Sequence, residues 1–137
     1  MRRQIAVDSG PLVALFDKND ADHQRALDFF VHTRFHGLVT SAVIAEVAHL
    51  LSFHSLAMLD FLEWIHRGGL SIVELDDDFG RAIELLHKYA DVPMDFADAT
   101  IVAACERLGV QDVLTLDSDF LIYRLHGRRM LRNLFVT

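Results

Sequence analysis

Short apolar runs typical of β-strands alternate with longer segments of helical periodicity along this chain. The run QIAVD, residues 4–8, is followed by SGP, a pattern typical of a buried strand that stops at Asp8. Further strands are expected at residues 38–41, 70–76, 113–117 and 134–137. Helices are expected at residues 11–17, 20–37, 42–52, 55–67, 79–91 and 95–108. Because strands joined through helices run parallel, the alternation predicts an α/β fold with helices on both faces of a mainly parallel sheet.

Size and composition indicate one folded domain spanning residues 1–137. Of the 137 residues, 52% are hydrophobic and 24% charged, which allows one core but not two ordinary domains. Cys105 is the single cysteine and lies in an apolar segment, so we expect a small core residue in a reducing compartment. The apolar stretch near the N-terminus is too short for a signal peptide, and no run is long enough to span a membrane. We therefore expect a cytoplasmic protein.

Four acids interrupt apolar sequence in a way that predicts a metal site. Asp8 and Asp117 end strand-like runs, whereas Glu46 and Asp98 lie inside apolar helical segments. In open α/β sheets the ligand crevice lies outside the carboxyl ends of the strands, where the two strand-end acids are expected. Hard carboxylate oxygens suit Mg²⁺ or Mn²⁺. A formal charge of -7 would repel nucleic acid, unless a cation lies among the acids or basic groups cluster elsewhere.

Each of these acids also has a purely structural explanation. Asp95 stands where a helix N-cap is expected, and Asp98 follows three positions later, so the pair could form a capping box. We favour capping for Asp95 but metal ligation for Asp98, because small and apolar residues follow it directly. Glu46 could be an exposed residue on a half-buried helix, and Asp8 and Asp117 could be turn acids. The presence of all four acids together favours a metal site over four separate structural roles.

Four segments of the chain, in this order, resemble those of PIN-domain ribonucleases, most closely the small VapC-like toxins of toxin-antitoxin pairs. They are IAVDSGPLVALFD, TSAVIAEVAHLL, MDFADATIVAACERLG and VLTLDSDF. The resemblance implies a three-layer α/β/α PIN-like fold with a central, mainly parallel sheet. It also implies metal-dependent endonucleolytic cleavage of RNA with Mg²⁺ or Mn²⁺, an antitoxin protein as partner, and a homodimer.

Position by position, the resemblance places the family's metal-binding and catalytic acids on four residues of this chain. These are Asp8, Glu46, Asp98 and Asp117, with Glu46 as either a ligand or the base that orients water. The supporting positions are Asp95, Ser9, Thr115 and Asp119. The spacing in LDSDF leaves open whether Asp117 or Asp119 supplies the fourth acid. Without a metal, clustered acids repel one another, so some of their pKa values should be raised.

The basic tail of the chain is the expected contact for RNA phosphates. Its arginines are Arg124, Arg128, Arg129 and Arg132, and guanidinium groups bind phosphate bidentately. A solvated basic face explains each arginine equally well. Phe120 and Tyr123 could stack on bases, but aromatic residues in this position are more often part of the core, and we expect the core here.

Two other functions fit parts of the pattern. A PIN-like module could bind RNA or a protein without cleaving, and could keep its acids for folding or metal binding alone. A receiver-like phosphotransfer domain also gathers acids around Mg²⁺ at parallel strand ends. A receiver needs a lysine near its last strand, and the lysines here are Lys18 and Lys88. The phosphotransfer function is therefore disfavoured, and the catalytically inactive module is the main alternative to a ribonuclease.

Overall fold

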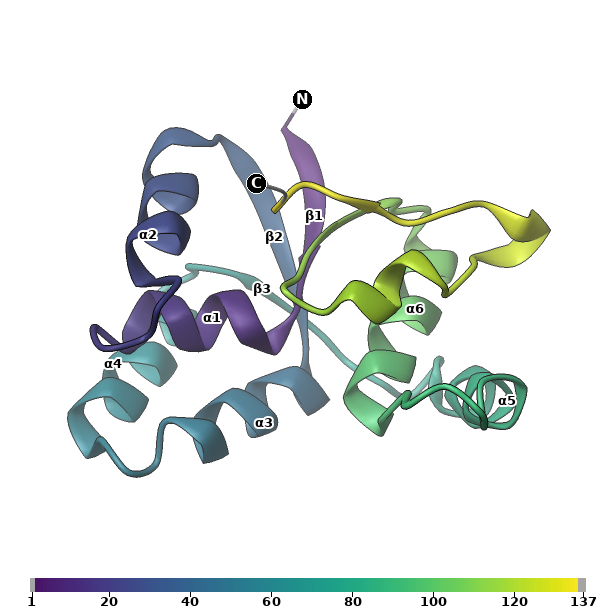
Figure 1. The fold of residues 1–137 in the computed structure, drawn as a ribbon, viewed down its shortest axis with the longest axis horizontal. Helices are drawn as coiled ribbons and strands as arrows, with labels where there is room; N and C mark the ends of the chain where they lie inside the picture. Colours follow the sequence, from purple (N-terminus) through teal and green to yellow (C-terminus); the bar gives the residue numbers. More distant parts are fainter. Residues whose placement is uncertain (1, 136–137) are drawn as a thin grey trace.

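A computed structural model describes residues 2–135 of the chain (Figure 1). Within these residues, five strands form one sheet in the order β3-β2-β1-β4-β5, and every neighbouring pair is parallel. The strands are β1 Arg3–Val7, β2 Phe35–Thr40, β3 Ser71–Val73, β4 Asp112–Leu114 and β5 Arg132–Asn133. The predicted parallel α/β sheet is confirmed.

The described residues also form six α-helices and two short 3₁₀ helices. They are α1 Ser9–Phe16, α2 His23–His32, α3 Ser41–Leu50, α4 Ser55–His66, α5 Phe79–Lys88, α6 Phe96–Leu108, η1 Ser118–Leu121 and η2 His126–Arg128. Figure 1 shows α1, α2 and α4 on one side of the sheet and α5 and α6 on the other, which confirms the three-layer arrangement. No helix within residues 2–135 is both long enough and apolar enough to cross a membrane.

The helix expected at residues 20–37 is wrong after residue 32. Helix α2 ends at His32, and Gly37 lies inside strand β2 instead of ending a helix. The reason is packing: a Cβ atom at Gly37 would overlap the side chain of Leu70, which is buried. The glycine therefore permits a close approach within the core, a use of glycine that local sequence does not distinguish from a helix end.

The last expected strand is also displaced. Strand β5 is Arg132–Asn133, paired with Asp112 and Val113 of β4, and not residues 134–137. Phe135 is outside the strand because its N–H donates to the Asn133 side chain at 3.0 Å, which bends the chain after β5. Residues 136 and 137 of the expected strand lie outside the described residues.

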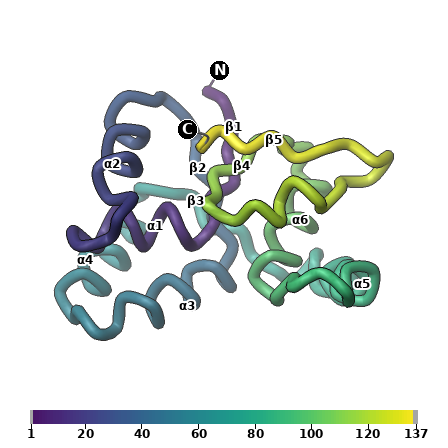
Figure 2. The backbone as a smooth tube through the Cα atoms, in the orientation of Figure 1, coloured from purple at the N-terminus to yellow at the C-terminus, as the bar shows by residue number. Residues whose placement is uncertain are grey.

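The order of the strands creates a switch point in the sheet, next to the predicted site acid Asp8. From β1 the chain builds outward through β2 and β3, and then returns to the other side of β1 to add β4 and β5 (Figure 2). The switch point therefore lies between β1 and β4. There the backbone N–H of Asp8 donates to the carbonyl of Leu114 at 2.9 Å. This bond fixes the ends of the two strands side by side.

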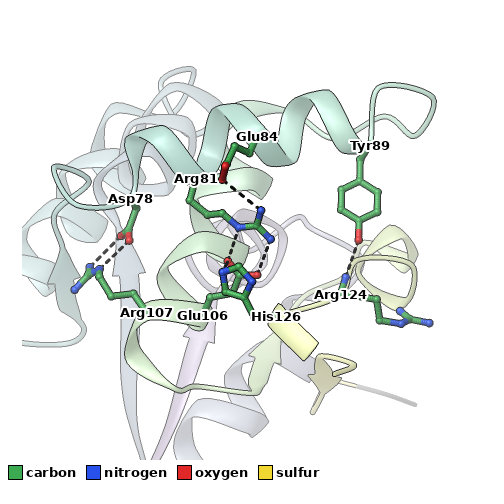
Figure 3. A network of polar contacts seen from close by, with 8 residues as sticks. All are labelled: Asp78, Arg81, Glu84, Tyr89, Glu106, Arg107, Arg124 and His126. Carbon is green, nitrogen blue, oxygen red and sulfur yellow. Dashed lines mark hydrogen bonds and ion pairs between the residues drawn. The ribbon is translucent and has the colours of Figure 1, made fainter. Parts of the chain in front are cut away.

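Two partly buried ion pairs hold α5 against α6 (Figure 3). The Arg107 guanidinium donates to both carboxylate oxygens of Asp78, at 2.8 and 3.0 Å. Arg81 does the same to Glu106, also at 2.8 and 3.0 Å. Both carboxylates are almost completely buried. Helix α6 carries Asp98 near its N-terminus, so these pairs also support the element that presents the candidate site.

The core contains the residues that the sequence assigned to it. Cys105 is buried in α6, and burial raises the pKa of its thiol to about 12, which makes it inert at neutral pH. Phe120 and Tyr123 are also buried, which confirms the expectation that they are core aromatics.

Candidate functional site

Asp8 lies at the end of β1 and caps helix α1. Its Oδ1 accepts a hydrogen bond from the Ser9 N–H at 2.7 Å, and its Oδ2 accepts one from the Thr115 hydroxyl, also at 2.7 Å. The same hydroxyl accepts from the Asp117 N–H at 2.9 Å. Thr115 therefore connects two predicted site acids across the ends of neighbouring strands.

Asp95 and Asp98 form the predicted capping box at the start of α6. The Asp95 side chain accepts from the Asp98 N–H at 2.8 Å, and the Asp98 side chain accepts from the Asp95 N–H at 3.1 Å. Asp98 is 7% exposed, whereas Asp95 is exposed. The capping explanation and the site prediction are compatible for Asp98, because its carboxylate caps the helix and also borders a cleft.

The cleft brings the predicted acids together. Its lining residues are Asp8, Ser9, Gly10, Glu46, Leu50, Pro93, Asp95, Asp98, Leu116 and Asp117. The four acids assigned from the sequence are all present, with Asp95 and Ser9 beside them, and Thr115 lies buried beneath. Asp119 is not part of this lining, and its N–H donates to the Asp117 side chain at 2.9 Å. The structure thus brings Asp117, and not Asp119, to the cleft.

The electrostatics of the cleft are those of crowded carboxylates. Half of the ten lining residues are acidic and, within the described part of the chain, none is basic. Burial raises the pKa of Asp8 to about 6, against the hydrogen bonds from Thr115 and Ser9. Burial also raises the pKa of Asp98 to about 8, and the charges of neighbouring aspartates act in the same direction. No basic side chain of the described lining residues offsets these charges.

The chemical type of the donor atoms in the cleft suits a hard divalent cation. The carboxylates offer oxygen ligands only, which is the donor set that Mg²⁺ and Mn²⁺ prefer. In residues 2–135, however, no three His, Cys, Asp or Glu side chains converge on one point as a finished metal site. Oxygens of Asp8, Asp98 and Asp117 are instead engaged by N–H and hydroxyl groups of the chain. Ligation would therefore require these side chains to turn toward the ion.

The raised pKa values predict how the metal-free protein responds to pH. The ordinary pKa of both acids is 3.8, so folding favours their protonated forms, and this stability is lost as the pH rises toward 8. In EDTA, we expect the Tm to be higher at pH 5.5 than at pH 8, by about 5 °C. The variant Asp98→Asn should lose most of this dependence, whereas Asp28→Asn on the exposed face of α2 should keep it. Thermal unfolding of the three proteins provides the measurement, and parallel curves for the wild type and Asp98→Asn would contradict the prediction.

The predicted RNA-binding arginines are not all near the cleft. Arg132 pairs with Asp112, as does Arg3 at 3.2 Å, at the amino ends of the strands and so at the opposite end of the sheet. Arg124 donates to the carbonyl oxygens of residues 121, 122 and 123, at 2.6 to 3.1 Å. Arg128 and Arg129 are exposed. RNA binding by these residues stays a prediction. Of the four, Arg124 and Arg132 use their guanidinium groups in hydrogen bonds to other described residues, and Arg128 and Arg129 have no such bond.

Asn133 supports the site but was not identified from the sequence. Its Oδ1 accepts from the Thr115 N–H at 3.2 Å, and its Nδ2 donates to the Thr115 carbonyl at 3.1 Å. This two-way contact fixes the backbone of the residue that holds Asp8. The two residues are 18 positions apart, and no local pattern in the sequence marks the pair.

Comparisons with known proteins agree with this geometry. Residues 5–124 match the family model of the PIN domain. VapC20 of Mycobacterium tuberculosis, a sarcin-ricin loop cleaving toxin, superposes with a TM-score of 0.77 at 23% identity, over 84% of this chain and 91% of that one. A toxin-antitoxin complex from Klebsiella pneumoniae gives 0.65 at 16% identity, over 85% and 89%. VapBC2 from Rickettsia felis, bound to a promoter DNA fragment, gives 0.67 at 14%, over 95% and 98%. At such identities these structures share the fold, and no curated protein matches the chain.

Proposed function

The chain belongs to the PIN domain family, and from this premise we propose that it is an endoribonuclease that requires Mg²⁺ or Mn²⁺. The observation that carries the proposal is the cleft at the switch point of the sheet. Asp8, Glu46, Asp98 and Asp117 meet there from four different parts of the sequence, with no basic side chain among the described lining residues. A ligand crevice with this many carboxylates, and with no basic side chain among its described lining residues, is suited to bind cations.

Each acid has a proposed role that follows from its surroundings. Asp8, Asp98 and Asp117 would hold the ion, because all three line the cleft and carry the hard oxygen atoms that Mg²⁺ and Mn²⁺ prefer. Glu46 is half-buried and would be a further ligand or the acceptor of a proton from the attacking water. A bound divalent ion would lower the pKa of that water and offset negative charge on the phosphate.

We further propose that the protein is the toxin of a toxin-antitoxin pair, acting in the cytoplasm. The structural likeness to VapC20 and to two toxin-antitoxin complexes supports this assignment. Leu50 at the end of α3, Phe53 in the turn that follows, and Leu56 and Leu59 in α4 are exposed, and Leu50 also lines the cleft. Four exposed apolar side chains within one short stretch of the chain are typical of a protein contact. We propose this stretch as the contact for an antitoxin or for a second copy of the chain in a homodimer.

Cleavage of RNA by the purified chain tests the proposal. We expect cleavage of a mixed-sequence RNA in Mg²⁺ or Mn²⁺ and none in EDTA. Asp117→Asn should remove it, whereas Asp119→Asn, which changes an acid outside the cleft lining, should have the smaller effect. Asp28→Asn controls for the loss of one negative charge. RNA binding without cleavage in either metal would contradict the nuclease and favour a PIN-like binding module.

A further inference from the structure

A second groove, the amino-end groove, lies at the amino ends of the strands, away from the acidic cleft. Strands β1, β2, β4 and β5 each contribute a polar or charged side chain to it. In Figure 1 the start of β1, beside the label N, lies at the opposite end of the sheet from the start of α3, the helix that carries Glu46. The polar residues that line the groove are Arg2, Gln4, His36, Gln111, Asp112 and Arg132.

Pairing between strands places several of these side chains next to one another. In the parallel register Gln4 pairs with His36, and Asp112 pairs with Arg132. Paired residues of neighbouring strands point to the same face of a sheet. The His36 ring is held further by Ser71 of β3, whose Oγ lies 2.8 Å from its Nε2. The sheet itself therefore fixes most of the polar lining of the groove.

Asp112 holds two arginine side chains at this end of the sheet. The Nε atom of Arg132 donates to its Oδ1, and the Nε atom of Arg3 lies 3.2 Å from its Oδ2. The carboxylate is 7% exposed, whereas the arginine side chains are 59% and 53% exposed. Within residues 2–135, the terminal Nη groups of both arginines donate no hydrogen bond to the protein. Asp112 thus orients two guanidinium groups and leaves their outer N–H donors for a ligand.

The amino-end groove is positively charged, although the whole chain has a formal charge of -7. The carboxylate of Asp112 faces the guanidinium groups of Arg3 and Arg132, and Arg2 adds a third positive charge. Arg2 is exposed and forms no ion pair with another described residue. Guanidinium groups bind phosphate oxygens through paired N–H donors, and the amide of Gln4 is a further donor. These donors suit a phosphate group.

We propose that the amino-end groove is a binding site for phosphate groups, separate from the acidic cleft. The phosphates belong either to the backbone of an RNA strand or to a small phosphate compound, and the same guanidinium chemistry recognises both. Strand β1 has five residues and so separates the two sites by about 17 Å, too far for the groove to contact a phosphodiester that reacts in the cleft. For RNA, the groove supplies a positively charged contact that the lining of the cleft lacks.

Substitution of two groove arginines tests the proposal. In Arg2→Gln/Arg132→Gln, Asp112 keeps Arg3 as its partner, so the Tm should stay close to that of the wild type. In EDTA and about 0.1 M salt, the Kd for a labelled single-stranded RNA should rise roughly tenfold or more. The slope of log Kd against log salt concentration should fall by about 1.4, because each lost phosphate contact removes about 0.7. The control Lys18→Gln/Lys88→Gln removes two cations outside the groove and should change both quantities far less.

A second ligand, inorganic triphosphate, identifies the source of the phosphate. Its binding is measured by calorimetry on the same three proteins. Weaker binding of RNA by the arginine variant assigns the groove to an RNA backbone, and weaker binding of triphosphate alone assigns it to a small phosphate compound. An arginine variant that binds both ligands as the wild type does, or a wild type that binds neither, would overturn the proposal. Cleavage is not measured here, so an absence of RNA cleavage would overturn the proposed function and leave this inference standing.

Discussion

Cleavage of RNA should fall by roughly a hundredfold or more when Asp8 is replaced by asparagine, while the protein stays folded. The amide oxygen of asparagine can still accept from the Ser9 N–H, so the cap of α1 is retained. The amide nitrogen would face Thr115, whose hydroxyl can accept as well as donate. What disappears is one negative charge in a buried position, 5% exposed, at the centre of the proposed ligand set.

Two measurements on the Asp8→Asn variant distinguish loss of the site from loss of the fold. Its Tm in EDTA should equal or exceed that of the wild type, because the wild-type carboxylate has a pKa raised to about 6 by burial. Binding of Mn²⁺ by calorimetry should be strongly weakened. Asp17→Asn, at the other end of α1, is the matched control and should bind and cleave normally. If Asp8→Asn still cut RNA at the wild-type rate in Mn²⁺, Asp8 would not be a ligand.

Local sequence signals were sufficient to predict most of the candidate site. Asp8 ends a strand-like run, and Asp95 and Asp98 have the spacing of a capping box, so each position is defined by its immediate neighbours. Parallel strands with alternating helices then imply one shared edge for their carboxyl ends. Glu46 interrupts an apolar helical segment, a pattern that an exposed helix residue explains as well, and the resemblance to PIN-domain ribonucleases supported its place among the site acids. The choice between Asp117 and Asp119 needed the structure, because both follow the same strand.

The features that could not be predicted all depend on contacts distant in sequence. Gly37 looked like a helix end because the side chain that excludes a Cβ there, Leu70, belongs to a segment 33 positions later. The ion pair of Arg81 with Glu106 spans 25 positions, and that of Asp78 with Arg107 spans 29. Charged residues on helices are usually solvated, so no local pattern predicts that these carboxylates are buried.

Replacing Arg81 by methionine should be the most destabilising of the substitutions considered, by about 3–5 kcal/mol. Glu106 is only 3% exposed, and Arg81 binds both of its carboxylate oxygens. Without Arg81, the remaining ion-pair partner of Glu106 among the described residues is His126, whose Nε2 lies 3.5 Å from Glu106 Oε1 and whose side chain is 72% exposed; Figure 3 shows the three residues together. The variant would therefore keep a buried charge without its partner. Arg67→Met is the matched control, because its partner Glu63 is 60% exposed and such surface pairs contribute at most about 1 kcal/mol.

The double variant Arg81→Met/Glu106→Leu should recover most of the lost stability, because an apolar pair needs no compensating charge. Urea unfolding at pH 8 in EDTA measures the single and double variants against the wild type. Cleavage of RNA should also recover in the double variant, since α6 would again pack against α5 and present Asp98 as before. An Arg81→Met variant no less stable than Arg67→Met would show that the buried pair contributes little to the fold. A double variant that is stable but inactive would instead show that the ion pair itself, and not only the packing of α6, positions the acidic cleft.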